Sequence, residues 1–503
     1  MTSSRPVRVC RGRSGALGLA VGIGALTLGL AACGSQLDPV EVRAANGLAG
    51  GVLADGTVPD GSGALAAPDG PTDTGGESGS GDTNGAAART GGESGGGDPR
   101  GESGGGDGGE DEGAPPVTGP KANCAGFKNQ TGITDDKVRI ANVADISGPV
   151  PGIFESAQEA TRAFAAYFNA SSDLCGRKLE VLALDSRADA GADQQSYARA
   201  CDQAFAAVGS MGAFDMGGAR QAESCGLPDM RSTSNTDERR GCGTCFAAQS
   251  VDPSGIPSAV HKWFLENHRG ATQKAAMLYV NAGAAVGNAR AFAKASEKNG
   301  WDNVYTTGID VSEFNYAPYV QEMKDLGVKL VQYVGPYQNT VKLQQAMQQG
   351  GLDAEVYLQD ATIYDPRYVQ QAGSAGDGSY VYMNNQMFER VDIPEMALYL
   401  QWLRQVKPGA TPTFFGLYAW SAARLFTQTA YGLGGDLTRS RIVAELGKVD
   451  DWTANGLHAP HHVGTKKSAE CTMIIQVNDG KWTQRSGRPG KFVCAPITQV
   501  SAE

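Results

Sequence analysis

Three histidines lie close together near the C-terminal end of the chain. His458, His461 and His462 fall within residues 456–464, and the whole sequence contains five histidines. Clustered imidazoles are common zinc ligands. The spacing is not helical, however, so a helix does not align the rings on one face. We therefore predict no metal site here, with zinc binding as the alternative.

No complete catalytic motif occurs between residues 123 and 503. HExxH, the Walker phosphate loop and GxSxG are all absent from this region, and each would supply a recognisable reaction centre. Asp185, Asp215 and Asp360 follow predicted strands and could act as paired acids. A binding cleft places polar groups at the same positions, so we predict a protein that is not an enzyme and needs no cofactor.

The N-terminus has the pattern of a lipoprotein signal peptide. Four arginines between residues 5 and 13 precede an apolar run at residues 16–30. A run of about 15 residues is too short for the ~20 that span a bilayer. The run ends in Leu-Ala-Ala-Cys, which looks like a bacterial lipobox. We predict a signal peptide at residues 1–32, acylation of Cys33, and a membrane contact through this lipid alone.

Residues 33–122 differ sharply in composition from the rest of the chain. Gly-Glu-Ser-Gly repeats occupy residues 74–82, 90–98 and 100–107, and so few large apolar residues cannot offset the entropy of folding. We predict a flexible spacer, with a binding tail as the alternative. A Gly-rich coil of ~75 residues would reach about 45–50 Å.

Charge and cysteine content restrict the function and the compartment. The formal net charge is -11, which argues against a nucleic-acid partner, because such proteins carry basic surfaces. Besides Cys10 and Cys33, an even number of cysteines lies in the exported region, which favours disulfides. Eight thiols allow about 105 pairings; the eight are Cys124, Cys175, Cys201, Cys225, Cys242, Cys245, Cys471 and Cys494.

Apolar runs and helical patterns alternate through most of the exported region. Val138, Ile140 and Val143 mark a strand buried on both faces, and residues 145–149 form a Ser-Gly-Pro loop before an Ala-rich helix that reaches Tyr167. We expect further strands at 178–184, 211–214, 275–280, 304–309, 329–334 and 355–359, with helices between them, including one at 192–208. This alternation predicts parallel α/β sheets.

The last part of the chain has a different pattern. Residues 393–406, 415–431 and 439–446 are predicted helices. Residues 472–483 form a predicted hairpin, because Asp479-Gly480 is a strong tight-turn signal.

Residues 133–500 resemble the type I periplasmic binding proteins of the leucine/isoleucine/valine-binding kind, the solute receptors of ABC importers. The resemblance rests on the order of several features: the strand and Ser-Gly-Pro loop at 140–149, Cys175-Gly-Arg-Lys-Leu-Glu, and Val331-Gln-Tyr-Val-Gly-Pro-Tyr337 before a helix. It implies two α/β lobes, each a mainly parallel sheet flanked by helices, joined by three crossing segments near Val251, Asn384 and Gly456.

The resemblance also implies domain boundaries. Lobe 1 takes residues 123–252 and 385–455, and lobe 2 takes residues 253–384 and the C-terminal hairpin region 456–503. The three histidines then lie on a crossing, where we expect a strand with exposed rings.

The predicted lobes narrow the disulfide pairings. Cys201 and Cys225 would lie on successive helices of one sheet face, near a bridge of the family. Cys471 and Cys494 flank the hairpin, and Cys124 and Cys175 precede neighbouring strands. Cys242-Gly-Thr-Cys245 could be redox-active, but such chemistry favours a cysteine at a helix N-terminus. Because this pair follows Arg239-Arg240-Gly241 in a predicted loop, we favour a structural bridge.

In the family, one lobe binds a carboxylate and the other binds an ammonium. Buried cations need a paired acid, and loop amides favour anions. Two departures argue against an ordinary α-amino acid: Met216 replaces an expected hydroxyl, and Ala284, Ala285 and Val286 lie where an aromatic is expected. The resemblance assigns ligand contacts to Ile153 and Phe154 as an apolar lid, to Met216, Gly217, Gly218, Ser234 and Thr236 on lobe 1, and to Tyr337 and Asp360 on lobe 2.

The function implied by this resemblance is solute capture outside the cytoplasm. We expect a monomeric, lipid-anchored receptor that binds an amino acid, an amide or a similar small organic molecule and delivers it to an ABC transporter permease. The alternative is a sensing or surface-binding lipoprotein of the same fold without a transport role.

Overall fold

The computed structural model describes residues 123–501. The predicted signal peptide, the lipid anchor at Cys33 and the spacer at 33–122 lie outside the described residues. None of the described helices is long and apolar enough to cross a membrane.

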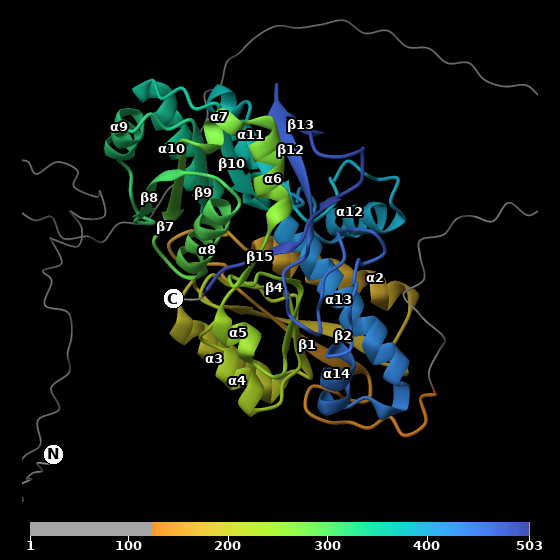
Figure 1. Ribbon diagram of the computed structural model, residues 1–503. Helices are drawn as coiled ribbons and strands as arrows, with labels where there is room; N and C mark the ends of the chain where they lie inside the picture. The colour runs from red at the N-terminus through yellow and green to blue at the C-terminus, as the bar shows by residue number, and fades with distance from the viewer. Residues whose placement is uncertain (1–122, 502–503) are drawn as a thin grey trace, which may run out of the picture. The chain divides into compact units, whose positions relative to one another are not determined.

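The first sheet has five parallel strands in the order β2-β1-β3-β4-β5 (Figure 1). Its strands are β1 (Lys137–Ala144), β2 (Lys178–Asp185), β3 (Ala206–Val208), β4 (Asp229–Ser234) and β5 (Cys245–Ser250). Along β1, Val138 and Ile140 pack into one apolar cluster and Ala141 and Val143 into another. Because successive side chains point to opposite faces, both faces of this sheet are buried.

Helices cover both faces of the first sheet. One face packs against α2 (Glu155–Ser171) and α13 (Phe414–Leu433), with α12 (Pro394–Val406) lying on α2 and α14 (Arg439–Leu446) on α13. The other face packs against α3 (Ala190–Gln203), α4 (Ala219–Ser224) and α5 (Asp237–Gly241). The C-terminal helices α12, α13 and α14 therefore complete a lobe that began at β1.

The second sheet follows the order β13-β12-β11-β10-β9-β7-β8, with β14 paired to β12. From β7 to β11 its strands are parallel, and β12 and β13 add antiparallel strands at one side. The strands are β7 (Ala275–Val280), β8 (Asn303–Ile309), β9 (Leu330–Val334), β10 (Val356–Asp360), β11 (Tyr380–Met383), β12 (Cys471–Asn478), β13 (Lys481–Gln484) and β14 (Val493–Cys494).

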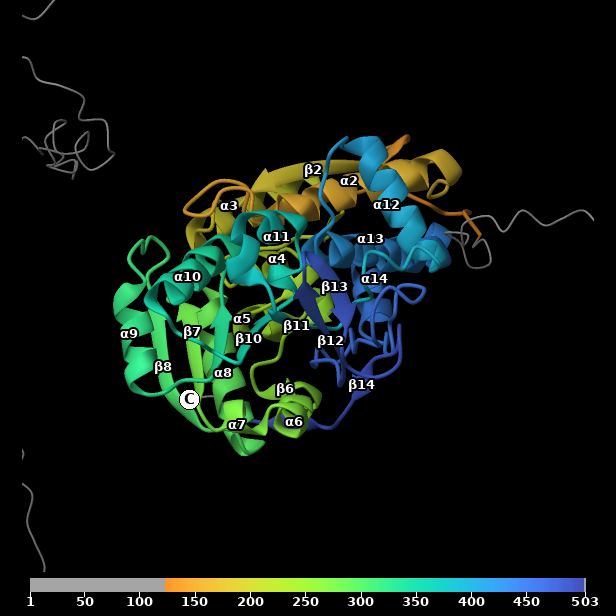
Figure 2. The same cartoon turned by 90° about the horizontal axis from the view of Figure 1, so that it is seen from above.

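The helices around the second sheet are mostly the crossovers between its parallel strands (Figure 2). They are α6 (Ser258–Asn267), α7 (Arg269–Thr272), α8 (Ala284–Lys298), α9 (Ala317–Asp325), α10 (Tyr337–Gly350) and α11 (Pro366–Ala372), with 3-10 turns η1 (Ala361–Ile363), η2 (Gly373–Gly376) and, in the first lobe, η3 (Gly434–Asp436). A separate two-stranded pair joins β6 (Gly255–Pro257) to β15 (Ile497–Gln499).

Three segments connect the two sheets. The chain leaves the first sheet after β5 through residues 251–254, returns from β11 to α12 through residues 384–393, and crosses again from α14 to β12 through residues 447–470. Backbone hydrogen bonds tie the second crossing to the third, from Gln386 N–H to Leu457 O at 2.8 Å and from Ala459 N–H to Asn384 O at 2.7 Å. The second and third crossings thus satisfy each other's buried backbone N–H and C=O groups.

Among residues 123–501, four disulfides are present: Cys124–Cys175, Cys201–Cys225, Cys242–Cys245 and Cys471–Cys494. These are the pairings that the sequence favours. The hairpin is present as well, with β12 and β13 joined through Asp479 and Gly480. Both turn residues have positive φ, 49° and 71°, which is the geometry that an Asp-Gly turn provides.

The region around β3 differs from the sequence prediction. The helix predicted at 192–208 ends at Gln203, and the strand is Ala206–Val208. The strand predicted at 211–214 is absent from the described chain, where Met211 makes only an isolated bridge to Ala144. The short apolar run Ala204–Val208 continues the helical pattern of α3, so periodicity alone did not reveal the break.

Candidate functional site

A cavity of about 370 Å³ lies between the two sheets. Its lining comes from loops of both lobes and from all three crossings, with Asp145 and Phe214 on one side, Asp360 and Val334 on the other, and His461 on the third crossing. Ligands of open α/β sheets bind just beyond the carboxyl ends of the strands. Asp145 follows β1 and Asp360 ends β10, so the cavity occupies that position for both sheets.

On lobe 1, Asp145 holds three loops together. Its Oδ1 accepts hydrogen bonds from Ser186 Oγ at 2.5 Å and Ala188 N–H at 3.0 Å, and its Oδ2 accepts one from Ala213 N–H at 2.8 Å. Burial raises the pKa of the Asp145 carboxyl, although these hydrogen bonds act in the opposite direction. Since both oxygens are engaged by the protein, Asp145 shapes the wall of the cavity.

On lobe 2, the Asp360 carboxyl lies in the cavity wall. Its Oδ1 accepts the Thr362 N–H at 2.9 Å and caps η1, and the Thr362 side chain also hydrogen-bonds the carboxyl. Burial raises the pKa of the Asp360 carboxyl. A cationic or N–H-bearing ligand group beside Asp360 would offset the free-energy cost of burying its carboxylate.

The rest of the wall is mainly apolar. Phe154 packs edge-on against Phe415, with ring centroids 4.6 Å apart, and Phe415 contacts Phe414. Other lining side chains are Ile153, Val251, Ile256, Val280 and Phe292. None of the described residues that line the cavity is lysine or arginine. The cavity therefore suits a solute with a large apolar part and few charges.

His461 brings a polar atom to this apolar cavity. The ring is 1% exposed, and its Nε2 lies 3.0 Å from the Tyr418 hydroxyl. Its Nδ1 is buried and has no hydrogen-bond partner among the described residues. Burial, with smaller contributions from His458 and His462, holds the pKa of His461 well below its usual value, so the ring is neutral.

The expectation of exposed histidine rings on this crossing is wrong for two of the three. His458 is 2% exposed, and its ring lies 5.0 Å from that of His461. The Nε2 of His458 contacts Ser421 Oγ at 2.8 Å, and its Nδ1 contacts Ala459 O at 2.8 Å. Burial lowers the pKa of His458 to about 4. The sequence did not reveal this, because helix α13 covers the crossing from a distant part of the chain.

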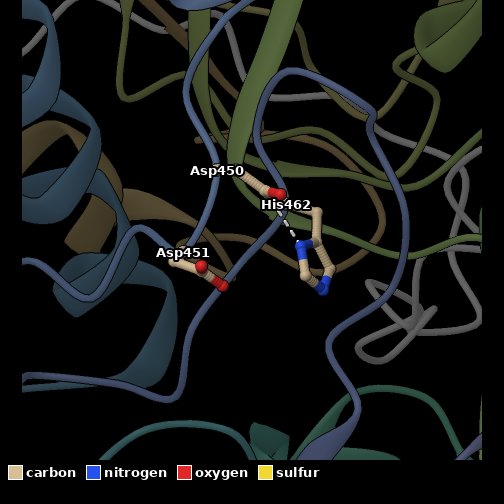
Figure 3. A group of neighbouring side chains, drawn as sticks. All are labelled: Asp450, Asp451 and His462. Carbon is tan, nitrogen blue, oxygen red and sulfur yellow. Dashed lines mark hydrogen bonds and ion pairs between the residues drawn. The ribbon is translucent and has the colours of Figure 1, made fainter.

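His462 lies apart from this pair and near two carboxylates. Figure 3 shows its Nδ1 facing Asp450, with Asp451 beside them; the Nδ1–Oδ1 distance is 2.5 Å. This is the cluster of possible metal ligands found among the described residues. Asp450 and Asp451 are exposed. The hydrogen bond to Asp450 accounts for the position of the His462 ring, and His458 and His461 take no part in the cluster.

Of the nine residues assigned to the ligand from the sequence, the structure places Ile153, Phe154 and Asp360 in the cavity wall. Met216, Gly217 and Gly218 lie outside the lining. A Cβ on Gly217 would meet the Ala190 carbonyl at 1.9 Å, and the Gly218 N–H donates to Asp193 Oδ2 at 2.7 Å. Residues 216–218 therefore pack against α3. Because β3 ends at Val208, the loop that lines the cavity comes earlier in the chain, around Met211 and Phe214.

Ser234, Thr236 and Tyr337 also lie outside the lining. Thr236 Oγ1 contacts Asp215 Oδ1 at 2.6 Å and caps α5. Tyr337 begins α10, and its ring packs under the Arg367 guanidinium at 5.4 Å.

Thr233 and Asn235 line the cavity in place of Ser234 and Thr236, and neither residue was predicted from the sequence. Residues two apart share one face of an extended chain, so a shift of one residue exchanges the two pairs. Alternation in β4 could have revealed the correct pair only if the end of the strand had been known.

The three carboxylates considered as paired acids are not brought together. Asp185 is exposed and binds the loop after β1, with its Oδ2 accepting from Ser147 Oγ at 2.6 Å. Asp215 is fully buried and contacts Arg231 at 3.9 Å. Of the three, only Asp360 reaches the cavity.

Comparison with known proteins places these features in a family. The model of the family described as periplasmic binding protein matches residues 137–481. Comparison with curated proteins gives no match.

Solved structures share the fold. A leucine-binding protein of Thermotoga maritima has a TM-score of 0.60 at 16% identity, covering 69% of this chain and 98% of its own. A branched-chain amino acid substrate-binding protein of Streptococcus pneumoniae, in complex with isoleucine, has a TM-score of 0.58 at 16% identity, covering 73% and 100%. A fatty acid ABC transporter substrate-binding protein of Thermomonospora curvata has a TM-score of 0.61 at 15% identity, covering 71% and 94%. These matches confirm the predicted two-lobe type I fold.

Proposed function

The chain belongs to the periplasmic binding protein family, and from this premise we propose that it is an extracytoplasmic receptor that binds a small organic solute between its lobes and delivers it to an ABC transporter permease. The observation that carries the proposal is the cavity of about 370 Å³, lined by both lobes and by all three crossings. A cavity of that size suits a small-molecule ligand.

The chemistry of the wall supports a mostly apolar solute. A free carboxylate on the ligand would enter a site whose charged lining residues are Asp145 and Asp360. Burying an anion without a paired cation is costly. An N–H or ammonium group facing the Asp360 carboxylate would instead gain a charge-assisted hydrogen bond.

The proposal includes a lipid tether. Cys33 would carry the acyl chain, and residues 33–122 would hold the binding domain away from the membrane. The support is the lipobox-like Leu30 to Cys33 at the end of the apolar run. Replacing Cys33 by Ala should move the protein from the membrane fraction to the soluble fraction. Membrane attachment that stays unchanged would contradict the tether.

The binding step is tested by a thermal-shift screen of the mature protein against amino acids, amides, urea-like compounds and small aromatic acids. A ligand present at a hundred times its dissociation constant should add about 2.7 kcal/mol to the free energy of unfolding. A screen with no shift, or a hit that is chemically converted, would refute the receptor proposal.

The transport step needs a separate measurement. Deleting the gene should abolish uptake of the radiolabelled hit by whole cells, and re-expression should restore it. Uptake that continues unchanged would favour a sensing or surface-binding role and refute delivery to a permease.

A further inference from the structure

His461 differs from His458, the other buried histidine of the third crossing, because it reaches the cavity. Its backbone is fixed by pairing with Trp452, through N–H to O bonds of 2.9 Å and 3.1 Å in the two directions. Its ring packs edge-on against Tyr418, with centroids 5.3 Å apart. The position of the ring is therefore set by the fold before any ligand arrives.

The tautomer of His461 follows from its partner. Tyr418 is fully buried, and burial raises the pKa of its hydroxyl well above 10, so the hydroxyl keeps its proton. Among the described residues, that hydroxyl has one hydrogen-bond partner, His461 Nε2 at 3.0 Å. A buried hydroxyl donates its proton to the acceptor within reach. Nε2 is thus the acceptor, and the single proton of the neutral ring lies on Nδ1.

We propose that the Nδ1–H of His461 is a fixed donor that recognises the carbonyl oxygen of an uncharged, mostly apolar amide in the cavity. This inference rests on the proposed receptor function and narrows its ligand class. His461 lines a cavity that has no lysine or arginine among its described lining residues, and its buried Nδ1 has no partner among the described residues. A ligand carbonyl would satisfy a donor that is otherwise left buried and unpaired.

A second unpaired atom on the neighbouring crossing completes the match to an amide. Asn385 lines the cavity, and its backbone pairs with His458. Its Nδ2 donates to Gln386 O at 2.9 Å, which fixes the side-chain orientation and leaves Oδ1 buried without a partner among the described residues. An amide offers both groups that these atoms lack, a carbonyl for His461 and an N–H for Asn385.

His458 provides a matched control. It lies on the same crossing, is equally buried, and is absent from the cavity lining. Its Nδ1–H donates to Ala459 O, so its Nε2 accepts from Ser421, which itself accepts the Trp452 indole N–H at 2.8 Å. Replacing His458 disturbs a satisfied buried ring without removing a group from the cavity.

The test uses calorimetric titration of the mature protein with three probes that share a phenyl group: phenylacetamide, phenylacetate and 2-phenylethylamine. His461→Gln retains an amide at the Nε2 position but no donor at Nδ1, and His461→Asn places an amide N–H near the Nδ1 position. We expect His461→Gln to weaken phenylacetamide binding about 10-fold, as for the loss of one buried hydrogen bond. We expect His461→Asn to retain affinity within about 3-fold, because its N–H restores the donor.

The second probe and the control variant test whether the effect comes from the His461 donor. The 2-phenylethylamine affinity of His461→Gln should change by less than about 2-fold, because this probe has no carbonyl for the donor to meet. His458→Gln should lower the melting temperature and leave all affinities unchanged. Equal losses of phenylacetamide affinity in His458→Gln and His461→Gln would overturn the inference, as would tighter binding of phenylacetate than of phenylacetamide by the parent protein.

Failure of this inference can be distinguished from failure of the receptor proposal. No binding of phenylacetamide at millimolar concentration would overturn the amide class, while the receptor proposal falls only if the broader solute screen finds no ligand. Nitrogen NMR of the histidine rings gives a readout that needs no ligand. An Nε2–H tautomer for His461 would also overturn the assignment of the donor.

Discussion

Replacing His261 should make the stability of the protein less sensitive to acid. His261 lies on α6 in lobe 2 and is fully buried, with its ring centroid 4.5 Å from that of Phe292 and 5.3 Å from that of Trp301. Its Nε2 has no partner among the described residues. Burial lowers the pKa of His261 from 6.5 to about 3.

The size of the effect follows from the difference between the two pKa values. Below pH 6.5 the unfolded chain binds a proton at His261 that the folded protein refuses until about pH 3. The stability tied to the neutral ring is therefore complete above pH 6.5 and falls as the pH decreases, by about 1.4 kcal/mol per pH unit. At pH 5 the loss from this one residue is about 2 kcal/mol.

The assay is urea unfolding of the parent protein and of His261→Phe at pH 7.5 and pH 5.0. We expect the difference in free energy of unfolding between the two proteins to shift by about 2 kcal/mol toward the variant at the lower pH. Buried carboxylates such as Asp145 titrate in both proteins and cancel in this comparison. As a control, Phe426→Leu shortens a fully buried aromatic side chain on α13 in lobe 1 and leaves His261 and its neighbours intact, so its cost should be the same at both pH values.

A His261→Phe cost that stays constant within about 0.5 kcal/mol from pH 7.5 to 5.0 would refute the reasoning. It would mean that the buried ring takes up its proton in the folded state as readily as in the unfolded chain.

Three other changes have expected outcomes. Replacing Cys471 and Cys494 by Ser should cost about 3.4 kcal/mol in unfolding free energy and replacing Cys242 and Cys245 about 1.6 kcal/mol, because the closed loops span separations of 23 and 3 residues; equal costs in denaturant unfolding would contradict this. Gly217→Ala should destabilise by about 1–3 kcal/mol, since its Cβ meets the Ala190 backbone, while calorimetry shows ligand affinity unchanged within about 2-fold because the residue lies outside the cavity. Asp360→Asn should weaken a cationic ligand at least ~30-fold in the same titration and a neutral one far less.

The architecture was predictable from the sequence because its signals are local and repeated. Buried parallel strands appear as short apolar runs, and crossover helices separate them at regular intervals. The Asp479-Gly480 turn specifies its own hairpin through the conformations that these two residues adopt easily. The disulfides could be narrowed because neighbouring strands and helices bring particular cysteines together. Each of these inferences needs only a segment and its nearest partners.

The site was harder to predict because it depends on where strands end, to within one residue. The third strand was predicted at 211–214 but β3 is Ala206–Val208, and this error moved the expected ligand loop from residues around Met211 and Phe214 to Met216 and its neighbours. The contacts assigned to Ser234 and Thr236 are each one residue away from Thr233 and Asn235, which line the cavity. Periodicity fixes which residues share a face, but packing against distant segments decides where a strand stops.

The crossings show why burial was the missing information for the histidines. Loops usually run over the surface because buried backbone needs partners. Here the second and third crossings supply each other's partners, as in the bond from Ala459 N–H to Asn384 O, so the third crossing can be covered by α13. Once covered, His458 has every ring nitrogen satisfied, whereas the Nδ1 of His461 does not. In an exposed loop, water would accept the hydrogen bond from His461 Nδ1–H. Because α13 buries this ring, the donor is available to a ligand, and the same burial could not be predicted from the sequence.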